Sequence, residues 1–343
     1  MRRIKYLLCA CIGALLVLCL SACSATEKPA ANSSQAAPAA TDVRVAALKG
    51  PTAMGLAGFI NKAETNASSL QNNYSFEVLG TADEVLPRLI RGELDFALLP
   101  ANVAALANAK TEGELCVVNI NTLGVLYLVS GDANIQGLDS LQGKTVLMTG
   151  KGTTPEYVMN YLLQEKGLSD VTLEYKSEAS EVAALLASNP QAVAVLPQPY
   201  ATSVCVQNES LHICGSLTEE WDALQENTPE AQRSMMVTGV TVVRKAFLEE
   251  HPEAVTEFMA QQAESVAFVN ENPDQAAELI VGLGIVGNAA IAQQVIPYCN
   301  IVFIADNQMK SALEGYYQVL ASSNPASIGG ALPASEFYAL ELS

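Results

Sequence analysis

The chain has few basic residues, and this scarcity limits what it can bind. Its 343 residues include 18 lysines and arginines against 36 aspartates and glutamates, which gives a formal net charge of −18. Downstream of Lys5 the basic residues form no cluster. Because a nucleic-acid backbone is bound by a basic face, the composition argues against a nucleic-acid partner. Half of the residues are apolar, which is typical of a folded globular protein.

Metal-binding and catalytic patterns are also missing from the sequence. The chain has two histidines, His212 and His251, and its cysteines form neither a CxxC pair nor a zinc-like spacing with histidine. His251 follows two glutamates and precedes a proline, which is typical of an exposed helix start. No Cys–His or Ser–His–Asp arrangement is supported, so we expect neither a cofactor nor an enzyme.

Four cysteines lie downstream of residue 23, and their pairing is open. Cys205 and Cys214 flank the segment VQNESLHI, which could connect two neighbouring strands, so a disulfide between them is one interpretation. Buried free thiols are the alternative for these two and for Cys116 and Cys299.

One apolar run stands out, and it lies at the N-terminus. The basic tetrapeptide RRIK precedes the segment Tyr6–Leu20, a pattern typical of a secretory signal and too short for a comfortable membrane span. The run ends in the tetrapeptide LSAC, which resembles the bacterial lipobox. That resemblance implies a signal peptide over residues 1–22 and a lipid on Cys23, which would hold the protein at the extracytoplasmic face of the cell membrane. An ordinary signal peptide is the alternative.

The segment after the signal is rich in alanine, serine and proline and has no apolar period. We predict a flexible tether over residues 23–41 and a folded part that starts near Asp42.

Two segments of the folded part resemble each other. DEVLPRLIRGELDFALLP (Asp83–Pro100) and SEVAALLASNPQAVAVLP (Ser180–Pro197) align without a gap and share Glu, Val, Leu, Ala, Leu and Pro at matching positions. Each predicts an amphipathic helix of about three turns and then a short buried strand closed by proline. Upstream of each lies a strand followed by a Lys-Gly-x-Thr loop, at Lys49–Thr52 and at Lys151–Thr154.

Strands that alternate with helices build parallel sheets covered on both faces. The two units therefore predict an α/β protein with two Rossmann-like lobes. The β-rich segments Glu114–Val129 and Ser234–Val243 could pass between the lobes and form a two-segment hinge, and the helical pattern from Lys245 onward would pack back on the first lobe. We expect lobe 1 to comprise residues 42–128 and 240–343, and lobe 2 to comprise residues 129–239.

The second of these loops invites comparison with a phosphate-binding loop. A Walker A loop needs a lysine directly after its second glycine and then a hydroxyl residue that holds magnesium. Lys151 is followed by Gly152 instead, so the sequence argues against an NTPase.

A different use of the two loops follows from helix physics. Free N–H groups at a helix N-terminus, together with the helix dipole, attract anionic or carbonyl oxygens. Thr154 before Pro155 suits the cap position of the following helix, although Thr153 and Glu156 could instead form a capping box that satisfies the donors internally. We expect ligand contacts from Lys49, Gly50, Thr52, Met54, Lys151, Gly152, Thr153 and Thr154, more strongly from the first loop. Two ordinary capped helices are the alternative.

Other strand ends should meet at the same place, because ligands of open α/β sheets bind at the carboxyl ends of the strands. Thr81 follows one strand, Pro100 and Asn102 follow the first repeat, and Gln198 and Tyr200 follow the second. Tyr200 is the natural aromatic wall, and the two amide side chains are natural hydrogen-bond partners. Surface packing is the alternative for each. We also expect Thr52→Asp to abolish ligand binding with little effect on stability.

Together these features resemble the solute-binding lipoproteins of ABC importers, which have the type II periplasmic-binding-protein fold. Within them the chain is similar to the NMT1-like branch, which binds nitrate, sulfonates, taurine or thiamine precursors. The resemblance covers Asp42 to about Ser343 and rests on the lipobox and on segments such as ALKGPTAMGLA, GELDFALLPANVAA, LQGKTVLMTGKGTTPEYVMNYLL and FVNENPDQAAELI. It implies a monomer that closes two lobes over a small molecule and then docks on ABC permease subunits.

The resemblance leaves the ligand open. Nitrate and sulfonate binders hold a small anion with basic or hydroxyl groups, whereas only Lys49 and Lys151 are basic near the expected site. Met54 and Tyr200 suit a partly apolar or heteroaromatic ligand equally well. Two other functions stay open, namely a tethered ligand sensor without an importer and an enzyme on the same fold, such as a pyrimidine-precursor or menaquinone-pathway enzyme. The enzymes of this fold are not lipid-tethered, which weighs against the last.

Overall fold

The computed structural model describes residues 40–229, 233–340 and 342. The expected signal peptide (1–22), the expected lipidation site Cys23 and all but the last two residues of the expected tether (23–41) lie outside the described residues. No helix in the described part of the chain is both long and apolar enough to cross a membrane.

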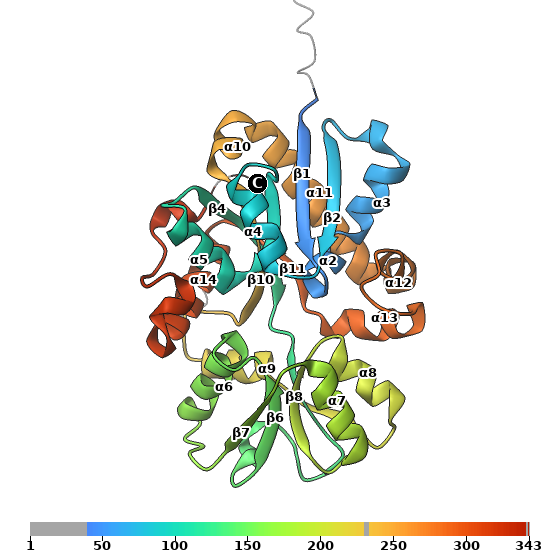
Figure 1. The fold of residues 1–343 in the computed structure, drawn as a ribbon, viewed down its shortest axis with the longest axis vertical. Helices are drawn as coiled ribbons and strands as arrows, with labels where there is room; N and C mark the ends of the chain where they lie inside the picture. Colours follow the sequence, from blue (N-terminus) through green and yellow to red (C-terminus); the bar gives the residue numbers. More distant parts are fainter. Residues whose placement is uncertain (1–39, 230–232, 341, 343) are drawn as a thin grey trace, which may run out of the picture. The chain divides into compact units, whose positions relative to one another are not determined.

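Six strands form the first sheet, sheet A, in the order β11-β4-β10-β3-β1-β2 (Figure 1). β1 pairs in parallel with β2 and β3, whereas β10 runs antiparallel to β3 and β4. The central strand β3 is buried along Phe96–Leu99, as expected for a strand covered by helices on both faces. The strands are β1 (Asp42–Leu48), β2 (Asn73–Leu79), β3 (Phe96–Pro100), β4 (Leu115–Leu123), β10 (Val237–Arg244) and β11 (Ile301–Ile304).

Helices cover both faces of sheet A and complete lobe 1. On one face Phe258 of α11 stacks on Phe96 of β3 with ring centroids 4.0 Å apart, and Phe59 of α3 packs edge-on against Tyr74 and Phe76 of β2. On the other face α4, α5 and α14 bury leucine, alanine and tyrosine side chains. The helices are α2 (Pro51–Met54), α3 (Ala57–Thr65), α4 (Ala82–Ile90), α5 (Ala101–Lys110), α10 (Lys245–Glu250), α11 (Pro252–Glu271), α12 (Pro273–Gly282), α13 (Ala289–Val295) and α14 (Asp306–Ser323).

Lobe 2 is built on a second sheet, sheet B, with the strand order β7-β6-β8-β5-β9. β6 pairs in parallel with β7 and β8, and β5 runs antiparallel to β8 and β9. The strands are β5 (Leu126–Ser130), β6 (Thr145–Thr149), β7 (Thr172–Lys176), β8 (Val193–Pro197) and β9 (His212–Ser216). The helices of lobe 2 are α6 (Thr154–Glu165), α7 (Ala179–Ser188), α8 (Tyr200–Gln207) and α9 (Leu217–Leu224).

The predicted α/β class with two sheets is confirmed, and the predicted helix–strand repeat accounts for it. α4 and β3 occupy the first repeat, and α7 and β8 occupy the second. In both repeats the strand lies next to the parallel strand that opens the lobe, β1 in sheet A and β6 in sheet B.

The crossings between the lobes lie a few residues from the expected positions. The β-rich segment Glu114–Val129 passes between the lobes as two strands, since β4 ends in sheet A at Leu123 and β5 starts in sheet B at Leu126. Gly124 between them is closely packed, since a Cβ there would come within 2.3 Å of Thr218 Oγ1. The expected boundary after residue 128 therefore falls inside β5, and the one after residue 239 falls inside β10.

On one side the two lobes share a single hydrophobic core, which passes through α14 and which we call the α14 flank. Trp221 of α9, the only tryptophan of the chain, is fully buried there. Its ring centroid lies 4.8 Å from that of Tyr161 of α6 and 5.7 Å from that of Tyr316 of α14. Asn324 Nδ2, just after α14, donates a hydrogen bond of 2.8 Å to Tyr157 Oη of α6.

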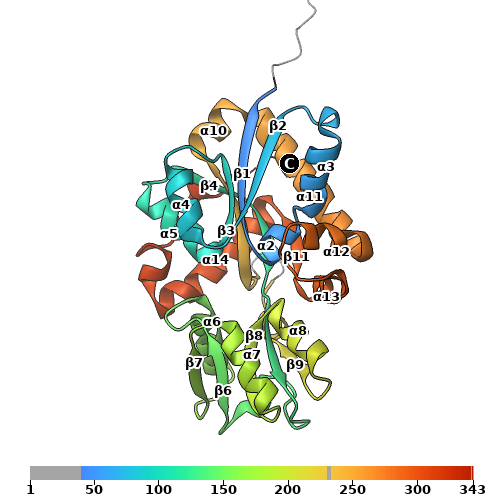
Figure 2. The same ribbon diagram turned by 45° about the vertical axis from the view of Figure 1, so that its right-hand side comes forward.

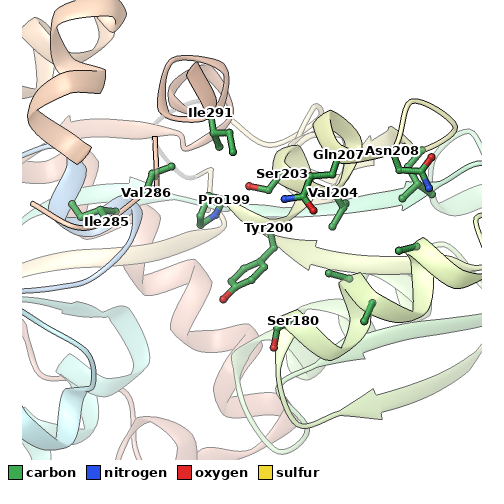
Figure 3. Close-up of a pocket in the computed structure, with 15 residues that line it drawn as sticks. Ser180, Pro199, Tyr200, Ser203, Val204, Gln207, Asn208, Ile285, Val286 and Ile291 are labelled. Atoms are coloured by element: carbon green, nitrogen blue, oxygen red, sulfur yellow. The ribbon is translucent and has the colours of Figure 1, made fainter. Parts of the chain in front are cut away.

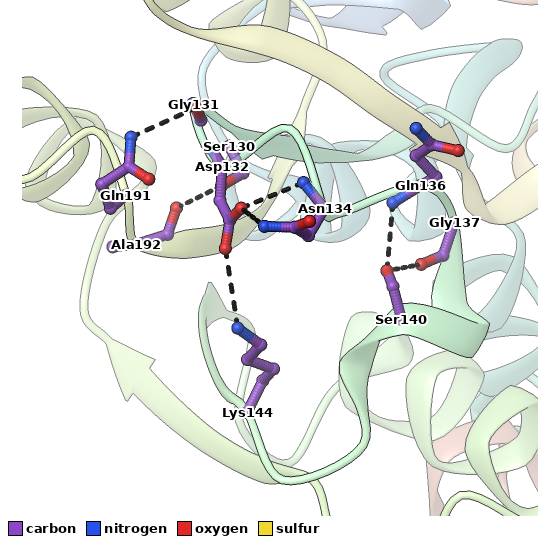
Figure 4. A network of polar contacts seen from close by, with 10 residues as sticks. All are labelled: Ser130, Gly131, Asp132, Asn134, Gln136, Gly137, Ser140, Lys144, Gln191 and Ala192. Atoms are coloured by element: carbon purple, nitrogen blue, oxygen red, sulfur yellow. Dashed lines mark hydrogen bonds and ion pairs between the residues drawn. The ribbon is translucent and has the colours of Figure 1, made fainter.

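A polar network lies at the end of lobe 2 where β6 and β8 begin (Figure 4). Ser130 Oγ donates to Ala192 O (2.9 Å) and accepts from Asp132 N (3.1 Å). The Asp132 carboxylate accepts from the backbone and side-chain nitrogens of Asn134, which together hold its pKa below the usual value, and pairs with Lys144 at 3.6 Å. These groups satisfy one another at the amino ends of the strands, away from the edge where ligands bind.

Candidate ligand-binding site

The helices that follow the parallel strands face one another across the two lobes. Figures 1 and 2 both show α2 and α13 at the edge of lobe 1 nearest to lobe 2, and α6 and α8 at the edge of lobe 2 nearest to lobe 1. Loops expected to bind ligand start α2, α6 and α8, whereas no expected loop precedes α13.

In the loop of lobe 1, Gly50 has free space beside it, whereas Thr52 is buried. Gly50 has a φ of 134°, which side-chain-bearing residues rarely adopt, and a Cβ added there would meet no atom within 4 Å. Lys49 is exposed. Thr52, by contrast, is 8% exposed, and its hydroxyl donates a hydrogen bond of 2.8 Å to Leu48 O. Backbone at Gly50 is therefore more accessible to a ligand than the Thr52 hydroxyl.

The prediction that Met54 contacts ligand is wrong. Its side chain is fully buried in the core of lobe 1, because α2 is a single turn whose last residue points under sheet A. The N–H groups of Ala53 and Met54 both donate to Gly50 O, at 3.1 and 3.2 Å. These two amides are used within the turn.

The loop of lobe 2 is held by its own side chains. Thr153, and not Thr154 as expected, occupies the cap position of α6, because the helix already begins at Thr154. Thr153 Oγ1 donates to Gly150 O, and Tyr157 Oη donates to Gly152 O, each at 2.6 Å. The loop carbonyls thus accept hydrogen bonds from within the lobe.

Glu156 accepts the hydrogen bond of the backbone amide that we expected to bind a ligand. Its Oε2 accepts a hydrogen bond of 2.5 Å from Gly152 N, so it closes the loop without forming the capping box with Thr153. Burial, and then the contact with Glu156, raises the pKa of the neighbouring Tyr175 hydroxyl. Lys151 Nζ lies 5.8 Å from the centroid of the Tyr175 ring. A carboxylate stands where a ligand oxygen was expected.

In both repeats a glutamate likewise accepts hydrogen bonds from backbone amides at the start of its own helix. Glu84 accepts from Gly80 N (3.1 Å), from Thr81 N (2.9 Å) and from Thr81 Oγ1 (3.0 Å), so Thr81 is engaged within its own helix start. Glu181 accepts from Ser177 N at 3.2 Å. These two glutamates match each other in the aligned repeats, and that identity was the signal for a common role that sequence reasoning missed.

The junction of β3 and α5 differs, since the first turn of α5 has no acidic residue and no side-chain cap. Pro100 and Asn102 are both partly exposed there. Tyr317 Oη donates to Ala101 O at 2.9 Å and fixes the helix start from within. Asn102 and the amides around it therefore have no acidic acceptor in the first turn of their helix, which is also true of the start of α2.

Gln198 and Tyr200 take different roles at the start of α8. Gln198 is 3% exposed, its Oε1 accepts from Thr202 N at 3.3 Å, and its N–H donates to Val125 O at 3.0 Å. Gln198 Nε2 and Thr202 Oγ1 are buried and have no hydrogen-bond partner among the described residues. Tyr200 is 42% exposed and free to face a ligand.

Tyr200 lines a groove of about 640 Å³ that lies between α7 and α8 of lobe 2 and residues 285–291 of lobe 1, which we call the α8 groove (Figure 3). Its volume is within the range of small-molecule sites. No charged side chain lines it, and its polar lining consists of serine, asparagine and glutamine. The apolar walls include Ala183, Ala187, Val204, Ile285, Val286 and Ile291.

The lobe 1 wall of this groove was missed by sequence reasoning, which treated everything after Lys245 as covering helices. Ile285 and Val286 lie in the segment GLGIVG between α12 and α13, a short apolar stretch between glycines. A short apolar stretch bounded by glycines, between two helical patterns, is the signal that could have identified it. Tyr200 is the one predicted contact that the structure places in this groove.

The disulfide considered between Cys205 and Cys214 is not formed, and the alternative of free thiols holds for both. Cys205 lies on helix α8 rather than on a strand and packs on the cluster to which Ile213 also contributes. Cys214, one residue along β9, packs on the cluster of the opposite face. Burial, and then the proximity of Cys214, raises the pKa of Cys205 to about 11.

The described residues contain no group of three histidine, cysteine, aspartate or glutamate side chains that could hold a metal ion.

Comparison with known families decides the class. Residues 68–293, about two thirds of the chain, match the family described as "ABC transporter, phosphonate, periplasmic substrate-binding protein". The chain belongs to this family. The resemblance to ABC-importer solute-binding proteins is therefore confirmed, and this family consists of substrate-binding proteins rather than enzymes. A search of curated protein sequences finds no match.

Solved structures share the fold of this family member. A structure of an ABC transporter from Parabacteroides distasonis has 22% identity and a TM-score of 0.71, over 87% of this chain and 98% of that one. The aliphatic sulphonate binding protein SsuA from Escherichia coli has 15% identity and a TM-score of 0.64, over 85% and 92%. The alkanesulfonate-binding protein SsuA from Xanthomonas axonopodis pv. citri, bound to MOPS, has 15% identity and a TM-score of 0.58, over 87% and 96%.

Proposed function

We propose that this chain is a monomeric, lipid-anchored solute-binding protein that captures a small molecule between its two lobes outside the cell membrane and delivers it to an ABC importer. The family match over residues 68–293 carries the proposal. The secretory pattern and the tetrapeptide LSAC support an anchor at Cys23.

The ligand contacts are proposed from both lobes. In lobe 1 the backbone at Gly50 and the amides around Asn102 offer hydrogen bonds, and in lobe 2 the exposed ring of Tyr200 offers an apolar wall. Dipolar donors from one lobe and an aromatic face from the other suit a ligand that bridges the two.

Crosslinking in intact cells tests both the anchor and the delivery. We expect the wild-type chain to stay in the membrane fraction and to crosslink to permease subunits, identified by mass spectrometry. Cys23→Ala removes the sulfur that would carry the lipid, so this variant should move to the soluble fraction, whereas the adjacent Ser24→Ala control should stay at the membrane.

A Cys23→Ala variant that remains in the membrane fraction would remove the lipid anchor from the proposal. A membrane-bound wild-type chain that retains a ligand but never crosslinks to a permease would favour a tethered sensor instead.

A further inference from the structure

We infer that the ligand of the α8 groove is an uncharged, mostly apolar molecule, and that Glu84, Glu156 and Glu181 keep phosphonates and sulfonates from the helix-start N–H groups that they occupy. The inference rests on the proposed function and specifies its substrate class, which differs from the phosphonates named in the family description.

The first argument is the chemistry of the α8 groove. Walls from both lobes are apolar, Tyr200 presents a ring that is 42% exposed, and the polar lining is uncharged (Figure 3). An anion placed in this groove would lose hydration without meeting a cation, which disfavours its binding. An apolar body with a few hydrogen-bonding groups meets partners on all sides.

The second argument is that carboxylates already occupy helix starts at the ligand edge of the sheets. Glu84 takes two N–H groups before α4, Glu156 takes one before α6, and Glu181 takes one before α7. These positions follow β2, β6 and β7, where an oxyanion would otherwise find donors. A phosphonate or sulfonate would have to displace a carboxylate to reach these N–H groups.

The third argument is that basic side chains of lobe 1 are paired elsewhere. Arg44 and Arg244 both reach Asp95, which is fully buried, with nitrogen–oxygen distances of 2.7 Å. Burial alone would raise the pKa of Asp95, but the hydrogen bonds from the two guanidinium groups outweigh it and hold that pKa below its usual value. Arg88 forms a two-fold contact with Glu77 at 2.7 Å.

The lysines of the two loops do not take the place of these arginines as anion-binding groups. Lys151 lies over the Tyr175 ring, and Lys49 is exposed to solvent, where salt screens its charge. Two buried polar atoms without a partner among the described residues, Gln198 Nε2 and Thr202 Oγ1, are neutral and are next in sequence to the lining residues Pro199 and Ser203. An amide and a hydroxyl match a neutral ligand group such as a carbonyl or a ring nitrogen.

Two measurements on the full-length protein, purified in detergent, test the inference. The first is equilibrium dialysis with methylphosphonate and ethanesulfonate. We expect no saturable binding of either anion by the wild-type chain. The triple variant Glu84→Gln, Glu156→Gln, Glu181→Gln should bind methylphosphonate saturably, with an affinity at least about tenfold above the weakest that the dialysis detects. Glutamine keeps a hydrogen-bond acceptor for the helix starts, and the melting temperature checks that the triple variant is folded.

The matched control is the triple variant Glu112→Gln, Glu226→Gln, Glu271→Gln, which removes the same charge from exposed positions elsewhere. An equal gain in the control would overturn the assignment of the three glutamates, because net charge alone would then explain the effect. Saturable binding of either anion by the wild-type chain would overturn the substrate class.

The second measurement is mass spectrometry of the compound that copurifies with the protein. We expect a molecule that is uncharged at neutral pH, retained by Val206→Ala and lost from Tyr200→Ala. Both residues lie on α8 and are 42% exposed, but only Tyr200 lines the groove. Recovery of a phosphonate or sulfonate would overturn the inference and leave the proposed function standing. A protein that retains no compound and binds neither anion would overturn both.

Discussion

The two Lys-Gly-x-Thr loops are alike in sequence and differ in what holds them. In lobe 1 the Thr52 hydroxyl turns back to Leu48 O, and the residues after it are buried without any charge. In lobe 2 Glu156 and Tyr157 reach back to Gly152 from the helix. The shared motif provides the glycine turn. Whether the backbone of the second loop is free to bind a ligand depends on Glu156 and Tyr157, which lie four and five positions after Gly152.

The largest effect should come from Thr52→Asp in the first loop. A carboxylate at this buried position would lie near Leu48 O without a donor, so we expect the free energy of unfolding to fall by about 3 kcal/mol. This differs from the expectation from sequence that the change has little effect on stability, because Thr52 is buried and its hydroxyl is hydrogen-bonded. Urea denaturation measures the loss.

Thr52→Ser is the matched control, because it keeps the hydroxyl and removes one methyl group. Its cost should stay near about 1 kcal/mol. If the aspartate variant were as stable as the serine variant, the first loop would be as exposed as the second, and the contrast between the lobes would disappear.

An intermediate effect should come from Tyr157→Phe in the second loop. The hydroxyl donates to Gly152 O and accepts from Asn324 Nδ2, so its removal should cost about 1–2 kcal/mol of unfolding free energy. Chemical denaturation of the full chain checks this. Tyr161→Phe, on the same helix, should be close to neutral, since its ring packs on Trp221 and no hydrogen bond of its hydroxyl supports the loop. Equal losses for the two variants would show that the loop does not depend on this contact.

The smallest effect should come from Glu156→Gln. Loss of a carboxylate beside the start of α6 removes a favourable interaction with the helix dipole, for which we expect about 0.5 kcal/mol at low salt and less at high salt. Glu165→Gln, at the other end of α6, should be neutral or slightly stabilising, because a carboxylate near a helix C-terminus is unfavourable. Thermal unfolding at two ionic strengths compares them, and a loss that does not respond to salt would contradict the electrostatic origin.

Much of the fold was predictable because the repeated pattern of strand, loop, helix and strand is local. Period-two and helical spacing identified α4, β3, α7 and β8 without tertiary information. The crossing was predicted within Glu114–Val129 but not at Gly124, because β-prone residues continue on both sides of that glycine.

The site was less predictable because exposure depends on distant parts of the chain. Met54 follows a glycine loop like a ligand contact, yet α2 is so short that its last residue enters the core. Ile285 and Val286 come from a segment 85 or more residues away from Tyr200, and no local pattern connects them. Glu84 and Glu181 were visible in the alignment of the repeats, but their role required the hydrogen bonds to the backbone.

The α14 flank has a consequence for how the molecule denatures. Trp221 of lobe 2 packs on Tyr161 of lobe 2 and on Tyr316 of lobe 1. Neither sheet can therefore lose the helices that cover it without exposing apolar side chains of the other lobe. The protein should therefore melt as one cooperative body, even though its backbone passes between two separate sheets.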